Sequence, residues 1–114
     1  MGCVFCSTPE DRKVYAGKLW FAIRDKFPVV EGHTLIIPNR HVRFVDELTE
    51  EEWASVFPLV KRFGGIDFNL GINRGAAAGQ TVFHVHIHVF PRIVGDVDNP
   101  RGGIRNFKTA LVPY

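Results

Sequence analysis

The sequence has little of what several classes of protein require. Its apolar runs fall far short of the roughly 20 residues that cross a membrane. The N-terminus lacks a basic segment followed by an apolar stretch, so no signal peptide is visible and we expect a cytoplasmic protein. Lysine and arginine total 14 against 12 acidic residues, a net charge of +2 with no bias toward nucleic-acid polymers. We therefore expect neither a membrane nor a nucleic acid as partner.

Repeats, low-complexity tracts and linkers are also absent from the 114 residues. A chain of this length fits a single domain spanning 1–114. Hydrophobic residues make up 46% of it, which is enough for a core. The small net charge leaves a small anionic ligand open, because local charge matters more than net charge for such a ligand.

The only two cysteines are Cys3 and Cys6, which form a C-x2-C pair. In a reducing compartment such a pair is more often a metal half-site or a redox motif than a structural disulfide. Zinc normally takes four ligands, so two more must come from elsewhere, and the histidines are the candidates. The alternative is a pair of reduced cysteines that bind nothing.

The stretch from 81 to 91 alternates with the period of a β-strand. Side chains on the same face of a strand stand roughly 6.6–7 Å apart, too far to touch but close enough to line one site. Three histidines in alternation behind a Gly-rich loop are hard to ascribe to packing, so we infer a functional site. The histidine face carries His84, His86 and His88, the apolar face carries Phe83, Val85, Ile87 and Val89, and Pro91 is expected to end the strand.

Three strands are predicted before residue 81. Residues 18–24 and 32–38 are predicted to form an antiparallel pair, because both have the composition of strands and a turn-forming segment joins them. Residues 68–73 predict another strand, and the Gly- and Ala-rich residues 74–80 predict a loop whose backbone can approach a ligand closely. A short helical turn is expected at 7–11.

A helix is predicted from Thr49, which forms a capping-box signature with Glu52. Pro58 should kink or divide this helix, and Gly64-Gly65 should end it. The apolar residues expected to cover its buried face are Trp53, Val56, Phe57, Val60 and Phe63.

The histidine stretch resembles the signature of the histidine triad family of nucleotide hydrolases and transferases. The pattern His-x-His-x-His-x-x, with x hydrophobic, begins at His84, follows Gly79-Gln80-Thr81-Val82 and precedes Pro91-Arg92. Gly-His-Thr-Leu-Ile-Ile-Pro at 32–38 resembles the family's second long strand. The likeness extends from Cys3 to about Arg105 and is greatest to the dinucleoside polyphosphate hydrolase branch, which includes the fragile histidine triad protein.

The resemblance implies an α+β fold with a mainly antiparallel five-stranded sheet, one main helix and a small zinc clip. It also implies a homodimer whose two sheets join. The implied metal is a structural zinc, and the residues at the matching positions are Cys3, Cys6, His41 and His84.

The same resemblance assigns roles in a nucleotide site. The implied catalytic residues are His86 as nucleophile, with His88 and His33 stabilising charge on the phosphate and helping to protonate the leaving group. The implied substrate-binding residues are Asp25 for the ribose hydroxyls, Ile23, Val4 and Phe5 for the base, and Asn73, Gln80 and Thr81 for the phosphate. Without the motif, Asp25 would be interpreted as a turn residue and the apolar three as plain core. Arg101 and Arg105 either meet distal phosphates or are solvated surface residues.

The implied reaction is cleavage of a nucleoside polyphosphate or phosphoramidate, an adenine nucleotide above all, at the α-phosphate. A covalent nucleotidyl-histidine forms, and water releases the nucleoside monophosphate. One alternative is a mononuclear metalloenzyme that uses His84, His86, His88 and His33, although ligands in a straight row cannot all reach one ion. A second alternative is a nucleotide-binding module without turnover.

Overall fold

The computed structural model describes residues 2–107 of the chain. The regular elements are β1 (Lys13–Ala16), β2 (Trp20–Arg24), β3 (Thr34–Pro38), α1 (Glu50–Gly64), β4 (Asp67–Ile72) and β5 (Ile87–Arg92). Short 3-10 turns lie at Glu10–Arg12, Val45–Glu47, Ala76–Ala78 and Gly103–Arg105. No helix in this part of the chain is long and apolar enough to cross a membrane.

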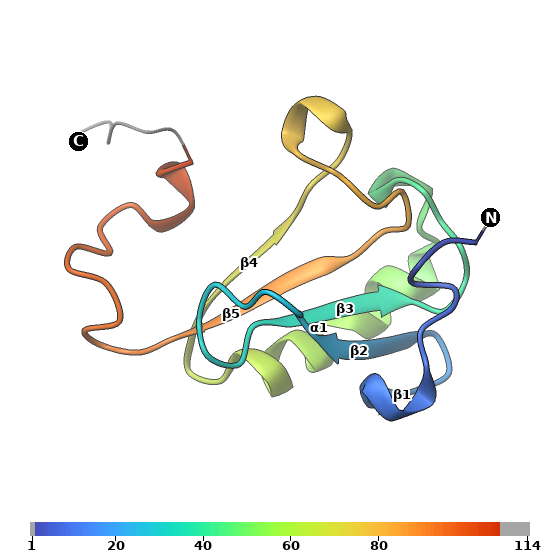
Figure 1. The fold of residues 1–114 in the computed structure, drawn as a ribbon, viewed down its shortest axis with the longest axis horizontal. Helices are drawn as coiled ribbons and strands as arrows, with labels where there is room; N and C mark the ends of the chain where they lie inside the picture. The colour runs from blue at the N-terminus through green and yellow to red at the C-terminus, as the bar shows by residue number, and fades with distance from the viewer. Residues whose placement is uncertain (1, 108–114) are drawn as a thin grey trace.

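The five strands form one sheet in the order β1-β2-β3-β5-β4, and every neighbouring pair is antiparallel (Figure 1). The predicted α+β fold with an antiparallel five-stranded sheet and one main helix is therefore confirmed. β1 was not located by the sequence, because its four residues are too few to show a clear alternation. The helical turn expected at 7–11 is found slightly later, as the 3-10 turn at Glu10–Arg12.

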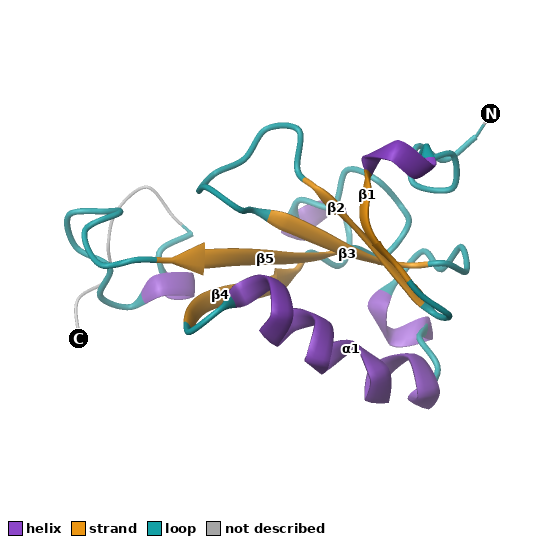
Figure 2. Ribbon diagram, turned by 90° about the horizontal axis from the view of Figure 1, so that it is seen from below, coloured by secondary structure: helices purple, strands orange, loops and turns teal. Residues whose placement is uncertain are grey.

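Helix α1 covers one face of the sheet (Figure 2). The larger core lies on this side and includes Trp20, Ile36, Ile87 and Val89. A smaller core lies apart from it and consists of Phe21, Ile23, Leu35 and Ile37, with Phe5 packed against it. Because neighbouring residues in a strand point to opposite faces, the histidine paired with Leu35, His88, faces away from α1.

In the predicted strand over residues 81–91, the apolar and histidine side chains lie on opposite sides as expected, but the strand is shorter than predicted. Val85, Ile87 and Val89 join the core beneath α1, whereas the ring of Phe5 contacts His84 and His86 on the other side. Regular pairing begins only at Ile87. Residues 81–86 are not part of a regular strand, and Val85 N–H donates to the carbonyl of Val42 at 2.7 Å. Pro91 does not end the strand, which continues to Arg92.

The predicted helix begins and ends as expected. Thr49 and Glu52 form the capping box, and Gly65 follows the last turn with φ of 79°, a backbone conformation that favours glycine. The helix continues through Pro58 without division. Pro58 is exposed, so water can satisfy the carbonyl that its ring leaves without a partner.

The predicted buried face of α1 is wrong for two of its residues. Trp53 and Phe57 are 45% and 53% exposed. The buried side is centred instead on Val56, Leu59 and Val60, with Glu52 at its start. The prediction counted only apolar residues and therefore missed Glu52, whose buried carboxylate belongs to this side of the helix.

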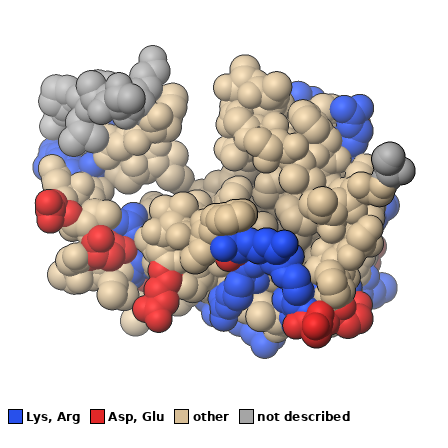
Figure 3. Space-filling view, in the orientation of Figure 1, with Lys and Arg blue, Asp and Glu red and all other residues tan. Residues whose placement is uncertain are grey.

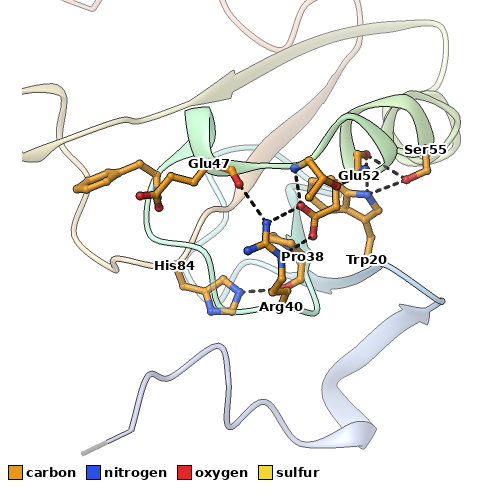
Figure 4. A network of polar contacts seen from close by, with 9 residues as sticks. Trp20, Pro38, Arg40, Glu47, Glu52, Ser55 and His84 are labelled. Carbon is orange, nitrogen blue, oxygen red and sulfur yellow. Dashed lines mark hydrogen bonds and ion pairs between the residues drawn. The ribbon is translucent and has the colours of Figure 1, made fainter.

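Glu52 is 3% exposed and is the centre of a polar network at the start of α1 (Figure 4). Its carboxylate accepts from Arg40 Nη2 at 2.9 Å and from Thr49 N at 2.9 Å, while its backbone carbonyl accepts from Trp20 Nε1 at 3.1 Å. Arg40 Nη2 also donates to the carbonyl of Glu47 at 3.0 Å. The network therefore fixes Arg40, and with it the backbone of the next residue, His41.

We expect Glu52→Gln to lower the free energy of unfolding by about 2 kcal/mol at neutral pH. The amide keeps one acceptor oxygen, but it lacks the charge that faces Arg40 and the second oxygen, Oε2, which accepts from Arg40 Nε at 3.3 Å. The hydrogen bond from Arg40 lowers the pKa of Glu52. The stability that this ionised group contributes is thus present above the unfolded-state pKa of about 4.3 and is lost as the pH falls through the lower folded-state pKa.

Urea unfolding of the wild type and the variant at pH 7 and at about pH 3 measures this effect, and the gap between them should shrink in acid. The matched control is Glu51→Gln, since Glu51 is exposed and its ion pair with Lys18 is long, at 4.0 Å. It should change stability by less than about 0.5 kcal/mol. Equal stability of the Glu52 variant and the wild type at pH 7 would show that the network contributes nothing.

Candidate functional site

Two of the three histidines of the alternating stretch belong to separate clusters, and the third lies between them. His84 lies with Cys3, Cys6 and His41, and His88 lies with His33 and Asp25. His86 lies between the two, and its ring is 5.2 Å from that of His88.

The first cluster has the geometry of a four-ligand metal site. One ligand atom from each of its residues lies within 4.8 Å of all the others. His41 Nδ1 is 3.2 Å from both Cys6 Sγ and His84 Nδ1, and Cys3 Sγ is 3.5 Å from His84 Nδ1. Tetrahedral zinc holds nitrogen and sulfur ligands roughly 3.3–3.8 Å apart, given its usual bond lengths. These residues therefore fit a metal ion of this kind.

Hydrogen bonding prepares His84 for that role. Its Nε2 lies 2.8 Å from the carbonyl of Pro38 (Figure 4). A carbonyl can only accept, so the proton resides on Nε2, and the lone pair of Nδ1 faces Cys3 and His41. Burial lowers the pKa of His84, which keeps the imidazole neutral. A neutral imidazole whose other nitrogen is held by a carbonyl is the usual form of a metal ligand.

In His86 the same reasoning places the proton on the other ring nitrogen, Nδ1. Its Nδ1 lies 2.9 Å from the carbonyl of His84 and must donate to it. Nε2 of the neutral ring is then unprotonated and has a free lone pair. His86 is 8% exposed, and the ring of Phe5 packs edge-on against it at 5.0 Å. A backbone carbonyl was expected to orient this ring, but no sequence pattern indicates which one.

A chain of donors runs through the second cluster. Val29 N–H donates to His33 Nδ1 at 3.2 Å, so the proton of neutral His33 resides on Nε2. This Nε2–H donates to His88 Nδ1 at 3.0 Å, while the nearest oxygen of Asp25 is farther, at 3.5 Å. His88 consequently carries its own proton on Nε2.

Burial makes both histidines of this cluster neutral. It lowers the pKa of His88 to about 4, and the neighbouring His86 and His33 act in the same direction. Burial also lowers the pKa of His33, against an opposing effect of Asp25. Near pH 7, His88 therefore acts as a neutral hydrogen-bond donor.

A cavity of about 480 Å³ opens beside His86 and His88. The ring of His86, with its unprotonated Nε2, and the ring of His88, with its N–H donor, both line this cavity, and their centroids are 5.2 Å apart. Eight residues that the sequence predicts for the site line it: Val4, Phe5, Ile23, Asp25, Asn73, Thr81, His86 and His88.

The geometry disfavours one metal ion held by all the histidines. Within residues 2–107, the clusters that can hold a metal are Cys3-Cys6-His41-His84 and Asp25-His33-His88, and neither includes His86. His84 and His88 thus belong to different groups, as the spacing along a strand implies. What the arrangement offers at His86 is a nucleophile.

Residues 8–94 match the model of the HIT domain family. The chain belongs to the HIT family. Among its curated relatives is adenylylsulfatase HINT3 of Arabidopsis thaliana, 39% identical over 102 residues that cover 79% of this chain and 52% of that protein. Another is bis(5'-adenosyl)-triphosphatase of Dictyostelium discoideum, 38% identical over 93 residues that cover 75% of this chain and 62% of that protein. The chain thus spans only half to two thirds of the length of these two relatives.

A solved HIT structure agrees in fold. The zinc-bound histidine triad family protein from Mycobacterium smegmatis superposes with a TM-score of 0.71 and 35% identity, over 84% of this chain and 78% of that one. The family resemblance seen in the sequence is therefore confirmed, and the structure of this HIT domain provides a cysteine–histidine cluster that suits a metal.

Two of the residues predicted for catalysis or substrate binding do not line the cavity beside His86 and His88. His33 lies behind His88 and lines the neighbouring cavity instead. Gln80 is 5% exposed, and its amide oxygen accepts from Gly75 N at 2.8 Å within the same loop. Its amide nitrogen donates to Arg43 O at 2.9 Å and so connects the loop to the segment between β3 and α1. Its contact with a phosphate stays a prediction, and the structure gives it a bracing role.

Six lining residues were not predicted from the sequence: Arg12, Lys26, Phe27, Leu35, Gly79 and Val82. One signal was available for Leu35, because it lies opposite Ile23 in the pairing of β2 with β3 and so shares its face. Arg12 had no such signal, since its position depends on the fold of the N-terminal segment. Arg101 and Arg105, predicted either for distal phosphates or for the solvated surface, do not line this cavity.

Proposed function

We propose that this HIT domain hydrolyses derivatives of nucleoside monophosphates at the α-phosphate and releases the nucleoside monophosphate. The observation that carries the proposal is the unprotonated Nε2 of His86, which follows from the bond of Nδ1 to the His84 carbonyl and belongs to a ring that lines the cavity. The names of the relatives, which specify an adenylylsulfatase and a bis(5'-adenosyl)-triphosphatase, support the same chemistry.

The proposed reaction has two steps. His86 Nε2 attacks the α-phosphorus, the bond to the leaving group breaks with its electron pair going to the leaving atom, and a nucleotidyl-histidine forms. The His84 carbonyl stabilises the positive ring through Nδ1–H. The Nε2–H of His88 donates to the developing negative charge. Water then attacks phosphorus, His86 leaves, and a nucleoside monophosphate and a proton are released.

The rest of the cavity suits a nucleoside. Ile23, Leu35 and Phe5 provide an apolar wall for the base, with Val4 at its exposed edge. An ionised Asp25 can accept from both ribose hydroxyls, since a carboxylate has only acceptors. Asn73 and Thr81 line the cavity with polar groups, and we assign them to the phosphate.

We expect Asp25→Ala to weaken the binding of adenosine monophosphate by roughly 10- to 100-fold, the usual effect of losing hydrogen bonds to a charged group. Asp25 Oδ1 also accepts from Phe27 N at 2.8 Å, so Asp25→Asn is the matched variant that can keep this turn.

Calorimetric titration with adenosine monophosphate and its 2',3'-dideoxy analogue separates the two roles of Asp25. The wild type should prefer the ribose form strongly, and the alanine variant should bind both forms alike. An unchanged preference in the variant would leave Asp25 as a turn residue only.

We propose that Cys3, Cys6, His41 and His84 bind one structural zinc. Four protein ligands leave no open position, so the ion contributes rigidity and no reaction step. It would fasten the segment that carries Val4 and Phe5 to the histidine stretch.

We also propose a cytoplasmic location and a homodimer. Strand β4 lies at the edge of the sheet, so its outer side is available for pairing with a second sheet.

Incubation with adenosine 5'-phosphoramidate and with diadenosine tri- and tetraphosphate, followed by chromatography, tests the proposed function. Release of adenosine monophosphate by the wild type and not by His86→Ala is the expected result. Tight nucleotide binding with no product from any substrate would favour a binding module without turnover.

A further inference from the structure

The row of rings that faces away from α1 does not end with the histidines. Phe90 follows His88 by two residues and therefore lies on the same face of β5. Its ring is parallel to that of His88, at 3° with centroids 5.7 Å apart, and its centroid is 4.3 Å from that of His33. We propose that Phe90 is a positioning residue, which holds His33 and His88 in the arrangement that makes His88 an N–H donor. The use of this donor on a phosphate rests on the proposed function.

Hydrogen bonds alone do not fix the arrangement of the two histidines. His33 Nε2–H lies 3.0 Å from His88 Nδ1, but a second acceptor, Asp25 Oδ2, is 3.5 Å from the same nitrogen. If either ring turned, the bond could pass to Asp25, and His88 could then carry its proton on Nδ1 instead. Such a ring would present a lone pair in place of an N–H. The donor role of His88 therefore requires a group that restricts the rotation of both rings.

Phe90 is placed to restrict that rotation. Stacked and tilted aromatic pairs at these centroid distances are favourable, so a turn of either histidine would lose contact with the phenylalanine. His86 follows on the other side of His88 along the row, with the two ring centroids 5.2 Å apart at an angle of 62°. His88 is thus held between two rings, of which only Phe90 also contacts the ring of His33.

Phe90 also separates the histidine pair from solvent. A cavity of about 360 Å³ reaches His33 and His88, and Phe90 and Val29 line both this cavity and a neighbouring one of about 410 Å³. Mostly uncharged surface borders the hollow beside the C-terminal segment on the face shown in Figure 3. Burial lowers the pKa of both histidines and keeps them neutral. Loss of the phenylalanine ring would admit water, which competes for their hydrogen bonds.

The effect of Phe90 should be confined to the chemical step. The described lining of the nucleotide cavity includes His88 but not Phe90, so replacing Phe90 leaves the nucleotide contacts in place. We expect Phe90→Ala to lower kcat by about 10- to 100-fold, because a misplaced donor loses most of its effect on the transition state. KM should change by less than about 3-fold. Phe90→Tyr keeps the ring and should keep kcat near the wild-type value.

Release of adenosine monophosphate from adenosine 5'-phosphoramidate, measured on the folded fraction, gives these values. Phe68→Ala is the matched control, since Phe68 is partly buried on the neighbouring strand β4 and packs against the larger core. It should lower stability but not kcat. Phe90→Thr suits a strand and also removes the ring, so it provides a second variant should Phe90→Ala fold poorly. It should lower kcat in the same way.

NMR of the imidazole nitrogens gives a readout that a purely structural role of Phe90 would not move. The unprotonated Nδ1 and protonated Nε2 of His88 should give two well-separated signals in the wild type, which move together in Phe90→Ala or Phe90→Thr as two tautomers average. Unchanged His88 signals in these variants, wild-type kcat in them, or an equal loss of kcat in Phe68→Ala would overturn the inference while the proposed function stands. If the wild type released no adenosine monophosphate, the proposed function would fail, and the NMR comparison would still decide whether Phe90 fixes the pair.

Discussion

Replacing His86 with alanine is expected to reduce kcat by about 10⁴-fold or more, because the covalent route disappears rather than one hydrogen bond. No other histidine can substitute for it. His84 directs its lone pair to the cysteine cluster, and His33 uses Nδ1 to accept from Val29 N–H and Nε2 to donate to His88. His88 accepts on Nδ1 and so presents an N–H, not a lone pair.

The comparison with His88→Ala makes this prediction specific. Loss of a donor to the transition state typically costs about 10²–10³-fold, so this variant should retain slow, measurable turnover. Release of adenosine monophosphate gives kcat, and titration with adenosine monophosphate checks that both variants still bind nucleotide. Near-normal turnover by His86→Ala would refute the mechanism.

The second large effect concerns the metal. We expect protein purified without added metal to contain one zinc per chain, and Cys6→Ser to lower the free energy of unfolding by about 3 kcal/mol or more, because binding to a site that exists only in the folded chain stabilises the fold. Desolvation and the adjacent Cys3 sulfur raise the pKa of the Cys6 thiol. A bound dication would lower this pKa instead, because it stabilises the thiolate that binds it.

Elemental analysis and thermal unfolding check this prediction, with Ser7→Ala as a control at an exposed neighbouring position outside the ligand set. The Cys6 variant should lose stability more than it loses kcat, measured on the folded fraction. A zinc content near zero in a fully active wild-type protein would contradict the proposed site.

The sequence was most informative where one residue type repeated at a regular spacing. Alternation alone placed the histidines on the face opposite Val85, Ile87 and Val89, and the structure confirms that separation. The ligand cluster of Cys3, Cys6, His41 and His84 is likewise brought together as the family resemblance implies.

The sequence was least informative where a backbone group decides the chemistry. The carbonyl of His84 orients His86 because residues 81–86 run outside the regular sheet, and no pattern of side chains encodes that path. The register of α1 was misjudged for a related reason. Glu52 is buried through Arg40, which comes from a distant loop, so Trp53 and Phe57 lie on the exposed flank.

The central claim is that His86 becomes covalently nucleotidylated. Wild-type protein mixed with adenosine 5'-phosphoramidate labelled at phosphorus, quenched within a single turnover, digested and mapped by mass spectrometry under conditions that preserve phosphoramidates, tests it most directly. The account predicts one labelled peptide, with the nucleotidyl group on His86 and no label in His86→Ala. A label on His88, His33 or any other residue, or rapid turnover with no labelled peptide at any quench time, would contradict it.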